Sequence, residues 1–357
     1  MDFLVDRGEL HNHRVDGGDD APALGEGEAL LRVDSFGFTA NNITYAVFGD
    51  MLSYWNFFPA EAPWGRIPVW GFADVVDANG TGLTEGTRVY GYLPMSTYLV
   101  VTPTRIDERG FVDGAAHRAS LPPTYNGYTR TDADPVYEVA REHQQNLLRP
   151  LFMTSFVIDD FLDDNGNFGA SAIILSSASS KTSIGTAYQL RAREGLEVIG
   201  LTSAANRSFV EGLDIYDRVV TYDEVSSLPV ADAVFVDMAG DAAVRASVHR
   251  HYGDRLRHSA AVGGTHWDAP PPDLGGEPLP GPAPAFFFAP DQIRKRSKEW
   301  GQAEVDARFG AAWKRYVEWT DRWLEVHEGA GADAITAVYV AMLDGRTDPS
   351  TGQILRP

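Results

Sequence analysis

The chain has 357 residues, 44% of them hydrophobic, and its 50 acidic residues against 30 basic ones give a formal net charge of −20. This length predicts two domains rather than one core, and the acidity argues against a nucleic-acid partner, which needs a basic face. The chain has no cysteine, which excludes disulfides, thiolate catalysis and cysteine-ligated metal sites, and no apolar run reaches the ~20 residues that cross a bilayer.

The first 20 residues are polar and acidic. They lack the basic and apolar regions of a secretion signal, so we expect a cytoplasmic protein without membrane association. We also expect this start to be mobile, and we assign no role to His11 and His13 within it.

Short apolar runs closely punctuated by Gly and Pro follow, and they predict strands. These runs cover residues 30–34, 69–77, 87–92 and 98–102. Helical periodicity is scarce here, so the first third of the chain is expected to form a β-rich, barrel-like unit. Residues 108–137 are irregular, and residues 136–148 have helical character.

From residue 172 onward, apolar strand runs alternate with helical segments. The predicted strands are 172–175, 197–201, 218–222, 233–238 and 258–262, and the predicted helices are 183–193, 206–212 and 241–252. Such alternation predicts a doubly wound parallel sheet.

The last part of the chain begins with a Pro- and Gly-rich stretch, residues 269–284, which predicts a loop. Residues 291–326 predict a long amphipathic helical stretch. Its Trp313, Tyr316, Trp319 and Trp323 recur at three-to-four spacing, which favours a stripe facing the core over a cofactor box. Residues 353–355 predict a final strand.

The turn between the first strand and helix of the alternating region is rich in serine. A strand, tight turn and helix present free backbone N–H groups to a pyrophosphate. Ser and Ala replace most of the usual glycines, but small residues still permit close approach, hydroxyls add donors and Lys181 adds a positive charge. The candidate cofactor residues here are Ser177, Ser179, Ser180, Lys181, Thr182 and Gly185. The alternative is a serine-rich turn without a ligand, and a P-loop is disfavoured because its glycines are absent.

The end of the second strand carries no acidic residue, which an NAD-binding protein usually has there to bind the ribose hydroxyls. It offers Thr202, Ser203, Asn206 and Arg207. These side chains suit a 2′-phosphate, which arginine can bind through charge-assisted hydrogen bonds. We therefore expect NADPH as the cofactor. The alternative is that Arg207 is a solvated helix residue.

Several segments resemble the zinc-free, quinone-oxidoreductase-like medium-chain dehydrogenase/reductases. They are residues 24–33, 35–42, 67–76, 86–91, 198–200, 234–240 and 351–355. The Ser-Ser-Lys-Thr turn combined with Tyr125-Asn126-x-Tyr128 resembles the DUF2855 family.

This resemblance implies an α/β chain with two domains and a substrate cleft between them. A GroES-like β-rich catalytic domain would be formed by residues 1–150 and 285–357, around a Rossmann cofactor domain of residues 151–284. A small-molecule substrate is the partner implied, and a homodimer is one option for assembly. Zinc-dependent members have Gly-His-Glu where this chain has Gly71-Phe72-Ala73. We therefore expect no metal site, and we expect His249 and His251 at the surface.

Without a metal, a carbonyl or alkene substrate needs a proton donor near the nicotinamide, and tyrosine or histidine can serve. In the family, the turn after the opening strand faces the cleft. The candidate catalytic residues from this turn and from the irregular segment are Tyr125, Tyr128, Tyr45, Asn42 and His117. The alternative for Tyr125 and Tyr128 is that their rings only pack the loop down, and His117 ranks below Tyr125.

These features predict an NADPH-dependent, zinc-independent oxidoreductase acting on a carbonyl or activated alkene of a small organic substrate. An alternative on the same fold is a lyase or hydratase-like enzyme that keeps NADP(H) as a bound or transient cofactor. A non-catalytic nucleotide sensor is a third hypothesis. The first two stay open at the level of sequence.

Overall fold

A computed structural model describes residues 1–18, 20–262 and 279–357, and the chain divides into two compact units. Unit 1 comprises Met1–Leu147 and Leu324–Pro357, so both ends of the chain contribute to it, and unit 2 comprises Leu148–Trp323. The first division lies close to the limit expected at residue 150. The second lies at residue 324 and not at 285, and the segment between these positions belongs to unit 2.

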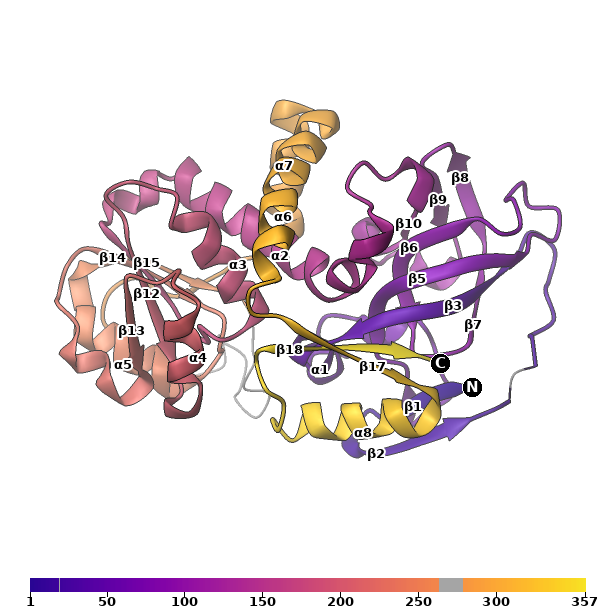
Figure 1. The fold of residues 1–357 in the computed structure, drawn as a ribbon, viewed down its shortest axis with the longest axis horizontal. Coiled ribbons are helices and arrows are strands. Elements are labelled where there is room, and N and C mark those ends of the chain that lie inside the picture. The colour runs from indigo at the N-terminus through magenta and orange to yellow at the C-terminus, as the bar shows by residue number, and fades with distance from the viewer. Residues whose placement is uncertain (19, 263–278) are drawn as a thin grey trace. The chain divides into compact units, whose positions relative to one another are not determined.

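Unit 1 is rich in β-structure (Figure 1). Its strands are β1 (Asp2–Asp6), β2 (Glu9–Asp16), β3 (Ala29–Phe38), β4 (Trp64–Gly65), β5 (Pro68–Asp77), β6 (Arg88–Pro94), β7 (Tyr98–Val101), β8 (Pro103–Asp107), β9 (Gly110–Asp113), β10 (Gly127–Arg130), β17 (Glu325–Ala330) and β18 (Thr351–Arg356). The larger sheet runs in the order β17-β18-β3-β5-β6-β10-β9-β8, with β7 also paired to β3, and the smaller sheet runs β2-β1-β4. The β-rich expectation for this region is confirmed.

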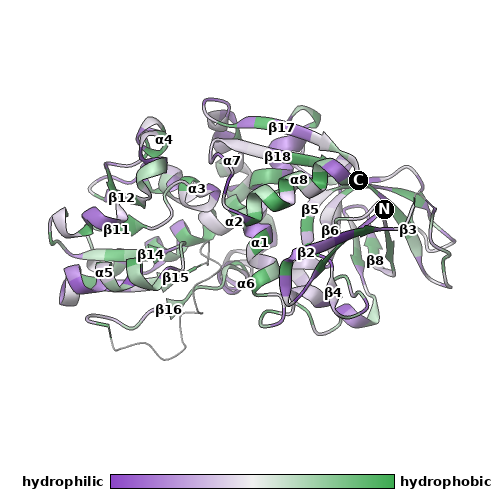
Figure 2. Cartoon of the chain, turned by 90° about the horizontal axis from the view of Figure 1, so that it is seen from below, coloured by the Kyte–Doolittle hydropathy of each residue, from purple (hydrophilic) through white to green (hydrophobic). Residues whose placement is uncertain are grey.

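The N-terminal segment is ordered as the β1–β2 hairpin, so the expectation of a mobile start was wrong. The apolar residues of β1 are buried, and Phe3 packs against Tyr339 of α8 (Gly331–Leu343) with ring centroids 5.2 Å apart. The Tyr339 hydroxyl donates to the Leu10 carbonyl at 2.6 Å. Helix α8 is largely hydrophobic (Figure 2), and burying its apolar face on the hairpin stabilises both segments.

Two further helices complete unit 1 and its junction with unit 2. Helix α1 (Ala40–Val47) follows β3 directly. Helix α2 (Glu142–Asp164) begins in unit 1 and continues into unit 2, so it is much longer than the helix predicted for residues 136–148. Gly37 of β3 lies under the start of α2, where an added Cβ would be 2.6 Å from the Asn146 carbonyl oxygen.

Unit 2 is built on a parallel sheet in the order β13-β12-β11-β14-β15-β16. Its strands are β11 (Ala172–Leu175), β12 (Glu197–Thr202), β13 (Arg218–Thr221), β14 (Ala233–Asp237), β15 (Leu256–Ala261) and β16 (Ala285–Phe286). The helices α3 (Lys181–Leu190), α4 (Arg207–Gly212) and α5 (Ala242–Tyr252) connect them. Strands β11 and β14 are buried throughout, as expected where helices cover both faces. The doubly wound sheet predicted from the sequence is confirmed, in the Rossmann strand order.

The predicted helical stretch 291–326 divides into α6 (Ala289–Trp300) and α7 (Gln302–Thr320). The break is at Gly301, which has φ +85°, a conformation that suits glycine. Residues 325–326 already belong to β17. The expected core-facing stripe is confirmed for α7, since Tyr316 stacks on Phe152 of α2 with ring centroids 4.2 Å apart.

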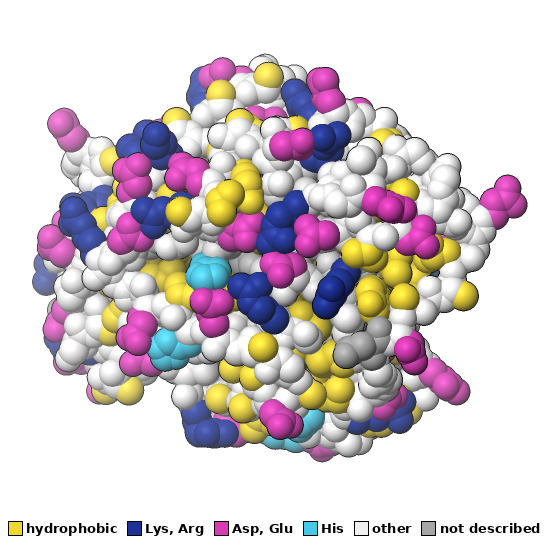
Figure 3. Space-filling view, turned by 45° about the vertical axis from the view of Figure 1, so that its right-hand side comes forward, with side chains coloured by type: hydrophobic (Ala, Val, Ile, Leu, Met, Phe, Trp, Pro, Cys, Tyr) yellow, Lys and Arg dark blue, Asp and Glu magenta, His cyan; other side chains and the backbone are white. Residues whose placement is uncertain are grey.

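The predicted loop 269–284 falls mostly outside the described residues, which resume at residue 279. In the described part of the chain, no helix combines the length and the apolar character needed to span a membrane. On the face shown in Figure 3, acidic and basic side chains are interspersed.

Candidate functional site

The serine-rich turn of unit 2 lies at the carboxyl end of β11 and leads into α3. Ser177 adopts a left-handed conformation with φ +50°, and Ser180 caps α3 by accepting a hydrogen bond from the Ser183 N–H at 3.3 Å. The turn also folds onto its neighbours, because the Ala178 N–H donates to the Leu201 carbonyl at 2.9 Å and Tyr216 Oη donates to the Ala178 carbonyl at 2.8 Å. The turn is therefore fixed on both sides, with the helix N-terminus, which favours anions, beside it.

The sequence analysis missed the residue that anchors this turn, Ser176. Its buried hydroxyl donates to Asp237 Oδ1 at 2.8 Å and accepts from the backbone N–H groups of Met238 and Ala239 at 2.9 and 3.0 Å. The Ser176 carbonyl in turn accepts from Ser183 Oγ at 2.8 Å. One side chain thus joins the carboxyl ends of β11 and β14, the edge where ligands bind in such sheets.

Asp237 was also missed, although it is a carboxylate at the end of the apolar run of β14. Its Oδ2 accepts from Arg245 Nε of α5 at 2.9 Å, and both side chains are buried, at 1% and 6% exposure. A second Asp237 bond, from the Gly240 N–H to Oδ1 at 3.0 Å, closes the turn after β14. An acidic residue ending a buried strand is a signal that the sequence already contained.

The small size of Gly185 lets α3 approach α2. A Cβ at this position would lie 2.6 Å from Ser155 Oγ and 3.2 Å from the Phe152 ring. Ser155 Oγ also donates to the Thr182 carbonyl at 2.8 Å. Of the predicted cofactor residues, Gly185 therefore serves helix packing, while Lys181 and Thr182 form the first turn of α3.

The structure brings the end of β12 together with the serine-rich turn. Asn206 Nδ2 donates to Ser179 Oγ at 3.0 Å, which connects the two predicted groups of cofactor residues directly. Ser203 precedes the short 3-10 helix η7 (Ala204–Asn206), and its carbonyl accepts from the Asn206 N–H at 3.1 Å. Thr202 is buried, and its Oγ1 has no hydrogen-bond partner among the described residues.

Arg207, which is predicted to bind a 2′-phosphate, is the first residue of α4 and contacts two carboxylates. Its Nε donates to Glu211 at 2.9 Å, and its Nη1 donates to both oxygens of Glu224 at 2.9 and 3.0 Å. Glu224 lies in the 3-10 helix η8 (Tyr222–Ser227) after β13. No local pattern predicts this contact, since Glu224 lies 17 positions after Arg207 in the chain.

In unit 1 the candidate catalytic tyrosines Tyr45 and Tyr125 lie in one aromatic cluster. The cluster also contains Tyr54, Trp70 and Tyr92, which the sequence analysis missed. Ring centroids are 4.4 Å apart for Tyr45 and Tyr54, 4.9 Å for Tyr92 and Tyr125, and 5.1 Å for Trp70 and Tyr92. These residues come from α1, the 3-10 helices η1 (Tyr54–Asn56) and η3 (Pro123–Tyr125), β5 and β6, so only folding assembles them.

Three tyrosines of this cluster, Tyr45, Tyr54 and Tyr92, are buried, while Trp70 and Tyr125 are partly exposed. Tyr92 Oη and Trp70 Nε1 are buried and make no hydrogen bond of ordinary geometry among the described residues, and both lie close enough to the Tyr45 hydroxyl to lower its pKa against the larger rise that burial causes. Burial, and then the neighbouring Tyr54 hydroxyl, raise the pKa of Tyr125 well above its ordinary value of 10. Burial likewise raises the pKa of Tyr45 and Tyr54. These hydroxyls therefore stay protonated well into the alkaline range.

The other three catalytic candidates make hydrogen bonds to backbone groups. Tyr128 Oη donates to the Tyr92 carbonyl at 2.7 Å, and its ring stacks on Phe111 at 4.9 Å. Asn42 accepts from the Thr39 N–H at 2.8 Å and donates to the Pro68 carbonyl at 2.9 Å, so it caps α1.

His117 contacts the Phe57 carbonyl through Nε2 at 3.2 Å. It lies in the 3-10 helix η2 (Ala116–Arg118), whose Arg118 pairs with the buried Asp113 at 3.1 Å. Contacts of this kind fix the irregular segment between β9 and β10.

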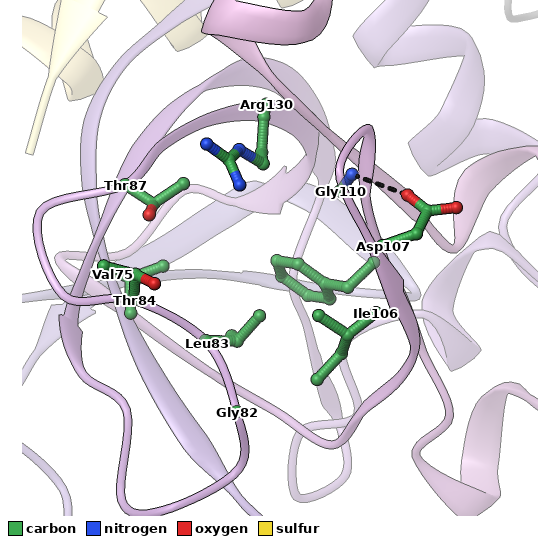
Figure 4. A pocket seen from close by; sticks show the side chains of 10 residues that line it. Val75, Gly82, Leu83, Thr84, Thr87, Ile106, Asp107, Gly110 and Arg130 are labelled. Carbon is green, nitrogen blue, oxygen red and sulfur yellow. Dashed lines mark hydrogen bonds between the residues drawn. The ribbon is translucent and has the colours of Figure 1, made fainter.

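A small pocket on unit 1 lies between the β5–β6 connection and the β8–β9 hairpin (Figure 4). Its lining residues are Val75, Gly82, Leu83, Thr84, Thr87, Ile106, Asp107, Gly110, Phe111 and Arg130. None of the candidate residues lines it. Its guanidinium, from Arg130, pairs with Asp132 at 2.6 Å.

Among residues 1–18, 20–262 and 279–357, no group of three or more His, Asp or Glu side chains is placed to hold a metal ion. The surface position expected for His249 was wrong. This side chain is fully buried where α5 packs on β15, with Nε2 3.0 Å from Ser259 Oγ and Nδ1 2.9 Å from the Pro280 carbonyl.

Comparison with known proteins supports the fold derived above. The family described as "Protein of unknown function (DUF2855)" matches residues 36–348. No curated protein sequence matches the chain.

Three solved structures illustrate the similarity. CurA from Vibrio vulnificus aligns over 97% of this chain and 93% of its own, with a TM-score of 0.61 and 12% identity. A mutant enoyl thioester reductase from Candida tropicalis aligns over 100% and 99%, with a TM-score of 0.56 and 11% identity. A putative NADPH:quinone reductase from Mesorhizobium loti aligns over 94% and 88%, with a TM-score of 0.54 and 12% identity. The expected medium-chain dehydrogenase/reductase fold, with its β-rich GroES-like and Rossmann parts, is confirmed.

Proposed function

The chain belongs to the DUF2855 family, and we propose that it is an NADPH-dependent oxidoreductase acting on a carbonyl or activated alkene of a small organic substrate. The observation that carries this proposal is the hydrogen bond from Asn206 to Ser179, which connects the segment after β12 to the serine-rich turn. Backbone N–H groups, hydroxyls and cations therefore lie together at the edge of the sheet where dinucleotides bind in such folds.

The polar groups at this edge fit a dinucleotide. The first turn of α3 and its positive end suit a pyrophosphate, and Ser177, Ser180 and Lys181 lie in the turn and at the start of the helix as candidate side-chain donors. The buried Thr202 hydroxyl, which has no partner in the described part of the chain, suits a ribose. CurA has been crystallised with NADPH, and a mutant of Etr1p with NADP and crotonyl-CoA, which supports the same cofactor here.

When bound, NADPH would supply a hydride to an electron-poor carbon of the substrate. The residues of this chain then have to supply a proton to the neighbouring atom. We propose Tyr125 for this role, because a tyrosine hydroxyl can act as a general acid and Tyr125 lies in the tyrosine cluster beside Tyr54. Tyr128 ranks below it, since its hydroxyl already donates to the Tyr92 carbonyl.

We also propose that the reaction needs no zinc, because the chain offers no cysteine and has Phe72 where zinc-dependent relatives have histidine. Incubation with EDTA is expected to leave both turnover and the thermal unfolding midpoint unchanged. Loss of activity with EDTA, restored by zinc, would overturn zinc independence. A homodimer and a cytoplasmic location stay predictions.

The experiment that tests the proposed function is NADPH consumption, followed by absorbance, against a panel of aldehydes, ketones, quinones and enones. Stoichiometric oxidation of NADPH with reduction of one class is expected. Substrate conversion without net oxidation of NADPH would favour the lyase or hydratase alternative. A protein that binds NADPH tightly but converts none of the panel would favour the nucleotide sensor.

A further inference from the structure

Arg207 is held by two glutamates at the edge of the sheet where the proposed cofactor binds. Glu211, one turn along α4, occupies Nε, and Glu224, from the connection after β13, occupies Nη1 with both carboxylate oxygens. Two of the three guanidinium nitrogens are therefore already engaged. Bidentate recognition of a phosphate by arginine needs two parallel N–H donors on one edge, so a 2′-phosphate has to compete with a carboxylate.

The two glutamates differ in how firmly they are held. Glu211 is an ordinary i,i+4 partner on the helix surface, with half of its side chain exposed. Glu224 is part of a capping box, in which its Oε2 accepts from the Thr221 N–H at 3.0 Å. These backbone and side-chain bonds to Thr221, and then Arg207, lower the pKa of Glu224. Glu224 is therefore a fixed negative charge at neutral pH.

The strand register places this charge beside the candidate ribose site. Thr202 at the end of β12 pairs directly with Thr221 at the end of β13, and Glu224 follows three residues later. Asn206, next to Arg207, reaches back to Ser179 of the turn. The connections after β11, β12 and β13 thus meet at one edge, and Glu224 supplies an acidic group there.

We infer that Glu224 is a specificity-determining residue of the site, which lowers the preference for NADPH over NADH by competing with the 2′-phosphate for Arg207. The inference rests on the proposed function. A 2′-phosphate carries close to two negative charges, so it meets both the loss of an arginine contact and repulsion from Glu224. A 2′-hydroxyl has no charge and meets neither. The end of β12 has no acidic residue, and Glu224, in the connection after β13, takes that place.

The test uses Glu224→Gln in the full chain, with NADPH and NADH affinities measured by isothermal titration calorimetry. Glutamine can still accept the Thr221 N–H bond of a capping box, so the fold is preserved while the charge is lost. NADPH is expected to bind roughly five- to tenfold more tightly, the scale of removing one unit charge from beside a phosphate near the surface. NADH affinity is expected to change by less than about twofold.

A matched control is Glu197→Gln. Glu197 pairs with Arg218 at 3.1 Å in a similar exposed ion pair, but at the opposite end of β12. This variant is expected to change neither affinity. Introducing Glu224→Gln into an Arg207→Ala background closes a double-mutant cycle, and there the gain for NADPH should shrink, because the competition acts through Arg207.

The measurements distinguish a failure of the proposed function from a failure of the role inferred for Glu224. If the unaltered protein binds neither nucleotide, the proposed function and this inference are both overturned. If it binds nucleotide but Glu224→Gln leaves the ratio of NADPH to NADH affinity unchanged, only the inference is overturned. Equal gains with and without Arg207 would likewise overturn the competition, and a shift confined to NADPH that depends on Arg207 supports it.

Discussion

The serine-rich turn of unit 2 and the tyrosine cluster of unit 1 are both rich in hydroxyls, but they use them in opposite ways. In the turn, Ser176 and Ser183 bond to backbone and carboxylate groups of the adjoining strands. In the cluster, Tyr92 Oη and Trp70 Nε1 are buried and make no hydrogen bond of ordinary geometry among the described residues, with the Tyr45 hydroxyl as their polar neighbour. Buried polar groups are normally satisfied. The hydroxyls of the turn therefore fix its backbone, while the cluster keeps polar groups that a substrate could use.

The largest expected effect comes from removing the Tyr125 hydroxyl. Tyr125→Phe keeps the ring contacts with Tyr92 and Phe57 and removes only the proposed proton donor. Turnover is expected to fall by about two orders of magnitude, with NADPH affinity unchanged. Steady-state kinetics on the substrate class found by the panel, together with NADPH titration, measure both quantities.

Tyr128→Phe is the matched control for this prediction. It also removes one buried tyrosine hydroxyl from unit 1, but that hydroxyl bonds to the Tyr92 carbonyl. We expect near-normal turnover and a loss of ~1 kcal/mol in the free energy of unfolding. If Tyr128→Phe and not Tyr125→Phe abolishes turnover, the proton donor is Tyr128 and not Tyr125. If both variants turn over normally, neither tyrosine is the proton donor, and Tyr45 or His117 becomes the candidate for that role.

The next effect concerns the hydroxyl that shapes the turn. Ser176→Ala leaves the N–H groups of Met238 and Ala239 without their acceptor and Asp237 without one of its donors. The free energy of unfolding should fall by ~1–3 kcal/mol, the cost of leaving buried groups unsatisfied, as measured by urea denaturation. Ser227→Ala removes one exposed hydroxyl bond, to the Glu224 carbonyl, and should leave the urea midpoint unchanged. Equal midpoints for the two variants would contradict the structural role of Ser176.

Much of the fold could be predicted because its signals are local. The alternating runs from residue 172 onward fix each strand of the parallel sheet by its own composition, and all five of the predicted strands are present. The failures involve long-range partners. The β1–β2 hairpin is ordered by Tyr339, more than 300 residues away. The missed strand β17 pairs with β18, which itself pairs with β3, also more than 300 residues away.

The candidate site likewise combines features set by local sequence with contacts between distant segments. Ser177, Ser179 and Ser180 follow one another in a turn whose backbone geometry the sequence already implies. The contact of Arg207 with Glu224, and that of Ser176 with Asp237, cross between strand connections, so only the assembled sheet creates them. The tyrosine cluster joins five separate segments, and its members beyond Tyr45 and Tyr125 carried no pattern that distinguishes them from core residues.

The smallest expected effect is a difference in how stability depends on alkaline pH. Burial raises the pKa of Tyr128 from 10 to about 12, so the folded chain holds a proton that the unfolded chain releases above about pH 10. Stability from this group is complete below pH 10 and falls as pH rises from 10 toward 12. Thermal unfolding of Tyr128→Phe should therefore show a shallower loss than the unaltered protein over this window, with a difference of ~1 kcal/mol for the first pH unit. Ser176→Ala has no titrating group to remove, so its curve should lie lower but run parallel to that of the unaltered protein. Parallel curves for all three proteins would show that the Tyr128 hydroxyl titrates as it does in water, and burial of this hydroxyl would then not contribute to the stability of unit 1 at alkaline pH.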